Sequence, residues 1–398
     1  MSRVTFKRDQ FTWLAYLMLA YFAYMQSAIG PLVNFLRVEL NLSYSEGALH
    51  GSAYAIGMII AGFIGGQIAR RWGRYATFWG GGAGMAVGGL FLALGSTLLV
   101  TVASAFVMGL IGTLLLSTIN ASLSDKHGMH RAVALTEANI SASIASMFAP
   151  LLLGGFAGIG LGWRAAILVF VLAWIVAVFS ARTITIPAIE DELPETKQLT
   201  RTPLPSAFWV FWILVVLGGA LEAGLGFWGA GFLNKAVGLP LETASGLMSV
   251  MFAAMVVGRV IGSRLTRWIN TNTLLIGTIL IVVVGFLIFW LSPVPLLNII
   301  GLFIVGLGIA NLFPLSLSAA ASAASSQADT ATAYVSLGAG LSILVVPQLL
   351  GVIADQVGIH SAFALIGIIA LAALFVIIGN ARYSKSEDGK GKNEFERS

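Results

Sequence analysis

Residues 273–291 read TLLIGTILIVVVGFLIFWL, a run that contains no charged side chain. A helix rises about 1.5 Å per residue, so a run of about 20 apolar residues crosses the roughly 30 Å hydrocarbon core of a bilayer. Comparable runs recur along the chain, separated by short polar segments. The stretch therefore predicts a membrane-spanning helix, and its recurrence predicts a polytopic all-α membrane protein.

The composition also indicates lipid as the main solvent. Of the 398 residues, 58% are hydrophobic and 10% are charged, and the mean hydropathy is +0.92. That is more apolar side chain than a water-soluble core of this size encloses. The net charge of +5 comes from Lys and Arg clusters between apolar runs, which predicts membrane orientation and not a nucleic-acid partner.

Twelve apolar runs are long enough to span, and they form two sets of six. The first set is 11–36, 46–69, 76–97, 99–122, 132–157 and 163–181, and the second is 206–233, 243–265, 273–291, 295–320, 329–354 and 361–381. Residues 182–205 between them contain four acidic residues and four prolines, which favours a polar linker. We therefore expect an N-terminal six-helix bundle at 1–181, a cytoplasmic linker at 182–205, a C-terminal six-helix bundle at 206–382 and a charged cytoplasmic tail at 383–398.

The basic residues predict the orientation of these spans. When successive loops are assigned alternately to the two sides, the side of the N-terminus receives nearly all of the Lys and Arg, and the other side receives Arg37, Arg164 and Lys235. Cytoplasmic loops carry such an excess of positive charge. We expect a multi-pass plasma membrane protein, of the bacterial inner membrane, with both termini cytoplasmic. The first run is too long for the apolar core of a cleaved signal peptide.

The two sets of helices resemble each other when the chain is slid along itself. At an offset of 196, one group of matches pairs Gly62, Gly66, Arg71 and Trp72 with Gly258, Gly262, Arg267 and Trp268, and at 197 another pairs Gly109, Pro150 and Gly154 with Gly306, Pro347 and Gly351. Each match occupies the same place in its half. This predicts a duplicated six-helix unit, an arrangement in which two bundles rock about a central site.

The segment 65–74, GGQIARRWGR, resembles the loop between the second and third helices of the major facilitator superfamily. Arg70 stands where that motif usually has an aspartate, so the usual charge relay from this loop is not carried over. Gly66, Arg71, Gly73 and Arg74 match the motif and are expected, with Arg70, to belong to a gate. Arg259, in the repeat of this region, is expected to serve a gate or to cap carbonyl groups.

Further segments resemble the branch of fucose:proton symporters. They are 218–222 (GGALE) ahead of Trp228, Gly258-Arg259, 306–308 ahead of Pro314, and 347–351 (PQLLG), which contains Gln348. This resemblance implies a secondary transporter that takes up a small polar metabolite such as a sugar together with protons.

Two carboxylates within spans are candidates for proton coupling, because a charge there is costly and needs a reason. Glu222 is flanked by glycines that allow a bend or a close backbone approach, and the alternative role is a hydrogen bond between helices. Glu137 is expected to find its partner on another helix or in water, because Arg131 lies on a different face of its own helix. A packing or gate carboxylate is the alternative there.

Polar and aromatic residues inside the spans are candidates for substrate binding. Gln26 is the repeat equivalent of Glu222, so the two are expected at similar depth on opposite sides of a cavity; an ordinary interhelical bond is the alternative. Sugars stack on aromatic rings and need paired polar groups, although any one aromatic side chain can equally pack or face lipid. The remaining candidates are Asn120, Asn139, Asn311, Trp228, Tyr334, Tyr54 and Gln348.

Other classes of function have little support. The chain has no cysteine, no phosphate-binding Gly-rich loop with Lys, and no His spacing with enough ligands for a metal, so we expect no cofactor and no enzyme activity. The alternatives left open are proton-driven efflux of an amphipathic or drug-like compound and a non-transporting membrane sensor. The expected partners are a small-molecule substrate, protons and the lipid bilayer, and the expected state is a monomer.

Overall fold

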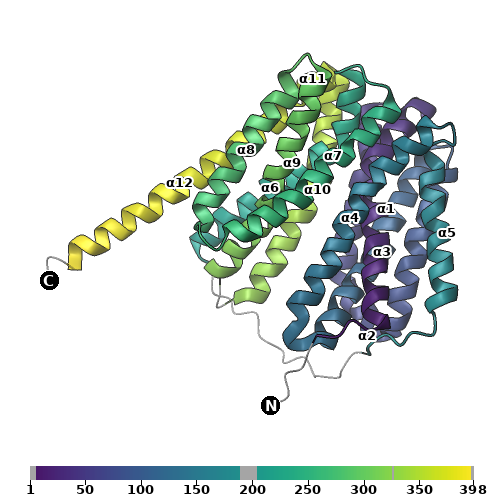
Figure 1. Ribbon diagram of the computed structural model, residues 1–398, viewed down its shortest axis with the longest axis horizontal. Helices are drawn as coiled ribbons and strands as arrows, with labels where there is room; N and C mark the ends of the chain where they lie inside the picture. The colour runs from purple at the N-terminus through teal and green to yellow at the C-terminus, as the bar shows by residue number, and fades with distance from the viewer. Residues whose placement is uncertain (1–5, 189–203, 325–326, 396–398) are drawn as a thin grey trace. The chain divides into compact units, whose positions relative to one another are not determined.

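The computed structural model describes residues 6–188, 204–324 and 327–395, and within them the chain is helical with no strand. The long helices are α1 (Gln10–Leu40), α2 (Tyr44–Leu94), α3 (Leu98–His127), α4 (Arg131–Gly158), α5 (Trp163–Ala181), α6 (Ser206–Lys235), α7 (Leu241–Leu265), α8 (Thr271–Leu291), α9 (Pro295–Ala323), α10 (Ala328–Val357) and α12 (Ala364–Phe395) (Figure 1). A 3₁₀ turn, Gly128–His130, joins α3 to α4, and the short α11 is Ile359–Ala362.

Ten helical segments of the described chain are long and apolar enough to cross a membrane. Two of them exceed a single span: α2 has 51 residues, and the segment Leu98–Gly158 has 61. Helix α2 covers two of the predicted spans, 46–69 and 76–97, and the predicted break between them is reduced to a kink at one non-helical residue, Gly73 (φ 80°, ψ 160°). Glycine adopts this positive φ without the strain that a Cβ would bring. The predicted linker 182–205 and tail 383–398 lie partly outside the described residues.

The chain forms two compact units that do not coincide with the two sequence halves. The described part of the first unit comprises 6–188, Gly226–Phe252 and Ile343–Ala362, so it holds all of the described first half and two stretches of the second. The described part of the second unit comprises 204–225, 253–324, 327–342 and 363–395. The division into two six-helix bundles stays a prediction.

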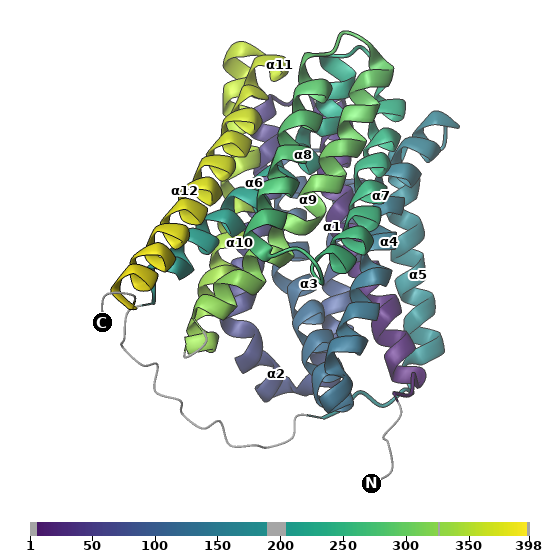
Figure 2. The same cartoon turned by 60° about the vertical axis from the view of Figure 1, so that its left-hand side comes forward.

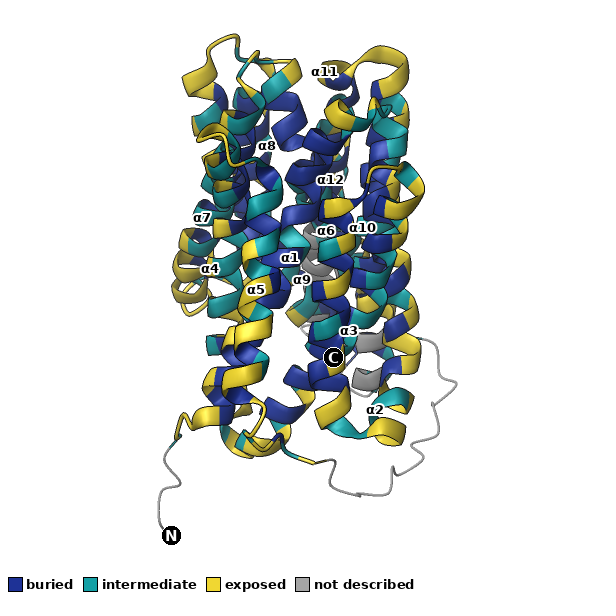
Figure 3. Cartoon of the chain, turned by 90° about the vertical axis from the view of Figure 1, so that its right-hand side faces the viewer, coloured by how far each residue is buried: buried dark blue, intermediate teal, exposed yellow. Residues whose placement is uncertain are grey.

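In the first unit, α2 packs along α3, and α1 packs along α4, with α5 beside them (Figure 2). Helix α1 is the centre of this packing and most of its residues are buried, whereas α5 is largely exposed and nearly all of its exposed residues are apolar (Figure 3). An apolar surface on a peripheral helix is expected where lipid covers it. In the second unit, α8 packs against α9 and α12.

Candidate functional site

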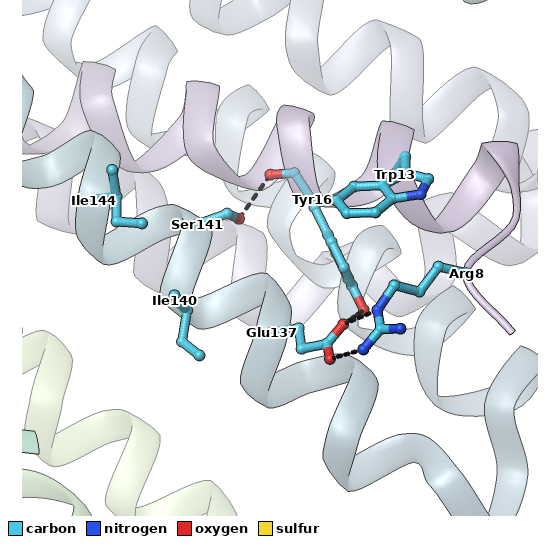
Figure 4. Close-up of a pocket in the computed structure, with 7 residues that line it drawn as sticks. All are labelled: Arg8, Trp13, Tyr16, Glu137, Ile140, Ser141 and Ile144. Atoms are coloured by element: carbon cyan, nitrogen blue, oxygen red, sulfur yellow. Dashed lines mark hydrogen bonds and ion pairs between the residues drawn. The ribbon is translucent and has the colours of Figure 1, made fainter. Parts of the chain in front are cut away.

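An open pocket of about 500 Å³ lies where the start of α1 meets the start of α4 (Figure 4). Its lining residues are Arg8, Trp13, Tyr16, Glu137, Ile140, Ser141 and Ile144. The four residues from α4 recur at three- and four-residue spacing, which places them on one face of that helix. The pocket thus has an apolar wall from α4 and an aromatic wall from α1.

Glu137 is the polar centre of this pocket. The Arg8 guanidinium donates from Nε to Glu137 Oε2 at 2.7 Å, and the Tyr16 hydroxyl donates to the same oxygen at 3.0 Å. The partners of Glu137 therefore come from α1 and the residues just before it. Arg131 is not a partner, in agreement with its place on a different face of α4. Both charged side chains of the pair are partly exposed, so solvent or a ligand can compete for them.

A second set of contacts fixes the start of α1 beside the pocket. Asp9 caps α1 by accepting a hydrogen bond from Thr12 N at 3.0 Å and pairs with Lys126 at 2.5 Å, while the Thr12 hydroxyl contacts His127 Nε2 at 3.0 Å. Partial burial raises the pKa of the Asp9 carboxyl, but the hydrogen bonds from Lys126 and Thr12 outweigh it, so the pKa lies below its usual value. The N-terminal end of α1 is thereby anchored to α3.

Further along α1, two half-buried polar side chains face neighbouring helices. Gln26 Nε2 lies 3.7 Å from Met58 Sδ on α2, and Ser27 donates to Ser146 Oγ on α4 at 2.9 Å. A thioether is a weak acceptor, so the Gln26 amide is held loosely.

Two more candidates in this unit are on α2 and α3. Tyr54, one turn before Met58, is only 2% exposed, and its hydroxyl has no hydrogen-bond partner in the structure. Asn120 on α3 is half-buried.

Glu222 lies in the second unit, half-buried on α6. Arg259 on α7 interacts with it electrostatically, although the sequence pointed to a gate or a carbonyl cap for this arginine. Gly218 and Gly219 let α6 approach α9 and α10 closely, since a Cβ on Gly219 would lie 3.0 Å from Ser342 Oγ. These glycines therefore bring three helices together beside the carboxylate.

Asn311 and Tyr334 also lie in the second unit. Asn311 is 8% exposed and donates to Gly258 O at 2.9 Å, which ties α9 to α7. Tyr334 is exposed at the start of α10, 5.3 Å from the Trp209 ring, and its carbonyl accepts from Trp212 Nε1 at 2.7 Å. In this conformation Asn311 serves packing, whereas the Tyr334 ring is accessible.

The other candidates for substrate binding lie in the first unit and already have protein partners. Trp228 is 1% exposed and donates to Pro347 O at 2.8 Å. Gln348 donates to Ser45 O at 3.2 Å, and Asn139 is exposed and donates to Leu135 O of its own helix at 2.8 Å. None of these three side chains lines the pocket at Glu137.

The predicted gate residues of 66–74 differ in their surroundings. Gly66, Arg70 and Arg71 are exposed. Arg74 forms an ion pair with Asp125 on α3 and donates to Ala188 O at 3.1 Å. Asp125 is thus the acidic partner of this basic segment.

Sequence reasoning missed several residues whose partners are distant in the chain. Arg8 lies ahead of the first predicted span and Asp355 lies just beyond the span 329–354, and neither was among the candidate site residues. Asp355 accepts hydrogen bonds from Tyr44 N and Ser45 N at 2.6 and 2.9 Å, more than 300 residues away. No local pattern marks such a pairing. The described residues contain no group of three His, Asp or Glu side chains placed to hold a metal.

Comparison with known proteins gives a family match and a set of similar folds. The sequence model of the Major Facilitator Superfamily matches residues 12–333. An uncharacterised MFS-type transporter of Yersinia pestis is 28% identical over 144 residues, which cover 36% of this chain and 38% of that protein.

Three solved structures share the fold. A bacterial homologue of the human lysosomal transporter Spinster, inward-facing and occupied, has a TM-score of 0.78 and 14% identity, covering 95% of this chain and 98% of that one. A mutant of the nucleoside transporter NupG scores 0.75 at 15% identity, covering 92% and 99%. A mutant of the peptide transporter POT, in complex with sulfate, scores 0.74 at 15% identity, covering 97% and 96%. At such identities the likeness concerns the fold alone.

Proposed function

We propose, since this chain belongs to the Major Facilitator Superfamily, that it is a secondary transporter that couples the uptake of a small polar metabolite to protons by alternating access. The family consists of membrane transporters and not enzymes, and the apolar helices of this chain fit a multi-pass membrane protein. Family membership gives the class of membrane transporter. The substrate, the coupling ion and the direction of transport are our proposal.

We propose twelve spans with both termini cytoplasmic. At about 1.5 Å per residue, α2 is more than twice as long as the roughly 30 Å hydrocarbon core, and the same holds for Leu98–Gly158. Each of these two segments therefore crosses twice, with turning points at Gly73 and at Gly128–His130. Adding these crossings to the other helices gives two sets of six, in agreement with the internal repeat.

Glu222 is the residue that we propose for proton coupling, and its position is the observation that carries the proposal. It is a carboxylate within an apolar helix, half-buried, with the charge of Arg259 nearby. An ionisable group at such a depth is costly and marks ion pathways. If the helices move Arg259 closer to Glu222, the carboxyl releases its proton. If they move Arg259 away, the carboxyl binds a proton again, so one proton is bound and released in each cycle.

For the substrate we propose a site in the first unit around Gln26 and Tyr54, with Asn120 on α3 as a predicted contact at another stage of the cycle. The Tyr54 hydroxyl is buried without a partner, and the Gln26 amide has only a thioether, so both can bond a polar ligand at little cost. Asn139, Asn311, Trp228, Tyr334 and Gln348 remain predicted contacts for other stages of the cycle.

Efflux of an amphipathic compound is a second candidate, favoured by the pocket at Glu137. Its walls include Trp13, Ile140 and Ile144, all exposed, next to an ion pair. Apolar walls with a few polar groups are typical of small-molecule sites. The few hydrogen-bonding groups here are fewer than the hydroxyls of a sugar need, but they suffice for an amphipathic ligand.

A proteoliposome screen separates these functions. Radiolabelled sugars, nucleosides and amphipathic cations would be tested with and without an imposed pH gradient. We expect a polar compound to accumulate along an inward proton gradient. Extrusion of an amphipathic compound would favour the second candidate, and gradient-independent equilibration of every transported compound would contradict coupling.

A further inference from the structure

We propose that Asp355 is a gating residue, whose carboxylate holds α10 to the start of α2 by completing the cap of that helix and releases it in each transport cycle. The proposal rests on the proposed alternating-access function. We call the set Tyr44, Ser45, Gln348 and Asp355 the α2–α10 latch. All four residues belong to the first compact unit.

The start of α2 needs partners for its unpaired N–H groups, and two of them are satisfied locally. The Ser43 hydroxyl accepts from Glu46 N at 3.1 Å, and the Glu46 carboxylate accepts from Ser43 N at 2.8 Å, which is a capping box. The N–H groups of Tyr44 and Ser45 lie between them and point out of the helix end. They remain unsatisfied by this box.

Asp355 supplies the missing partners from α10. One carboxylate oxygen accepts a hydrogen bond from Tyr44 N at 2.6 Å and the other accepts one from Ser45 N at 2.9 Å, and the side chains of Ser43 and Ser45 also bond to the carboxylate. A negative charge is also favoured at a helix N-terminus. The cap of α2 is therefore complete only while α10 is in place, which makes the contact specific and charge-assisted.

One face of α10 continues the contact along α2. Gln348 donates to Ser45 O at 3.2 Å, and Leu344 O accepts from Ser52 Oγ at 3.2 Å. Gly351 lies so close that a Cβ there would be 2.8 Å from Tyr44 O. A close backbone approach at Gly351 and hydrogen bonds, most of them to backbone groups, thus join the two helices over this face.

A cationic stack supports the same end of α2. The Arg37 guanidinium lies 3.3 Å from the Tyr44 ring centre and 5.5 Å from that of Trp228. Trp228 in turn donates to Pro347 O on α10. The stack links α1, α2, α6 and α10 beside the latch, at the start of α2.

The absence of cysteine allows a direct test of the latch. Ser52→Cys places a thiol in the buried face between α2 and α10, where a maleimide reacts only when the face opens. The protein is held in lipid nanodiscs, so reagent reaches both sides and neither substrate nor gradient is needed. Ser104→Cys, buried on α3, reports general loosening of the fold.

In the Ser52→Cys background, we expect Asp355→Asn to raise the labelling rate roughly tenfold and Asp355→Ala to raise it further, since charge-assisted bonds are lost. Asp355→Glu should restore part of the protection. The matched control is Glu39→Gln, because Glu39 also pairs through both oxygens, with Arg164 on α5. That variant should label Ser52→Cys at the unaltered rate.

Equal labelling of the Asp355 variants and the Glu39→Gln control would overturn the proposal. A parallel rise at Ser104→Cys would also overturn it, because it would show loss of structure and not release of a latch. Normal latch behaviour in a protein without gradient-driven accumulation would leave the latch standing and reject the proton coupling, so the two failures are distinguishable.

Discussion

At the scale of single residues, the buried polar groups of the first unit separate structural from functional roles. Trp228 and Ser27 have defined partners within the fold. The Tyr54 hydroxyl has none, although it is almost fully buried. A buried hydroxyl without a partner costs free energy of folding, and this cost is the reason that we propose Tyr54 as a substrate contact.

Tyr54→Phe should therefore leave the thermal unfolding temperature unchanged or higher while it weakens substrate binding. The free-energy gain on removing an unsatisfied buried hydroxyl is about 1 to 3 kcal/mol. Unfolding in detergent micelles, with transport in proteoliposomes, checks both effects. A clear loss of thermal stability with unaltered transport would show that the hydroxyl is structural.

Asp9 gives a dependence on pH at the end of α1. Its pKa is lowered in the folded protein, so its contribution to stability is fully present above the unfolded value of about 3.9 and disappears as the pH falls through the folded value. As the pH falls through the folded pKa of Asp9, hydrogen exchange at the Thr12 amide, which Asp9 caps, should accelerate relative to the pH trend of uncapped amides. Asp9→Asn should remove this step, and a step that persists in the variant would assign it to another group.

At the scale of elements, sequence patterns predicted most helices and misjudged how they join. The apolar runs predict α8 and α9 closely, because a span must be long and uncharged. The break predicted between 69 and 76 is present but shorter than a loop, because a single glycine with positive φ suffices to end one helical run and begin the next. Partners such as Asp355 with Tyr44, or Arg8 with Glu137, depend on tertiary packing that helical periodicity does not encode.

Gly73 and Gly66 form a matched pair for testing this junction. Gly73→Ala should lower stability by about 1 to 3 kcal/mol, because Gly73 has φ 80° and ψ 160°. Gly66→Ala should be neutral or mildly stabilising, since a Cβ there meets no atom within 4 Å and alanine favours a helix. Thermal unfolding of both variants measures these changes in stability. An equal change in the two variants would argue against a turn at Gly73.

At the scale of the whole molecule, the repeat and the apolar runs predict a membrane transporter, and family membership confirms that class. The resemblance to fucose:proton symporters concerns one branch within the family. Family membership does not test this finer assignment, which stays a prediction. The internal repeat relates residues within the sequence, whereas substrate choice depends on side chains that converge only after folding. Gln26 and Glu222 illustrate this, because their equivalence in sequence does not specify what either one binds.

Two single cysteines test the topology of the long helix α2. If α2 crosses twice with the N-terminus inside, Ser96→Cys should react with an impermeant maleimide in intact cells, and Ala76→Cys should react only after permeabilisation. Both positions are exposed in the structure, so access depends on the side of the membrane. The reverse pattern would invert the orientation, and labelling of both from outside would reject two crossings.

Gradient-driven accumulation in proteoliposomes, compared between the native chain and Glu222→Gln, tests the central proposal most directly. The native chain should concentrate its substrate above equilibrium when an inward proton gradient is imposed. Glu222→Gln should still exchange substrate across the membrane but only to equilibrium, while Glu242→Gln, in the first turn of α7, should accumulate substrate as the native chain does. Undiminished accumulation by Glu222→Gln would contradict the assignment of proton coupling to this carboxylate.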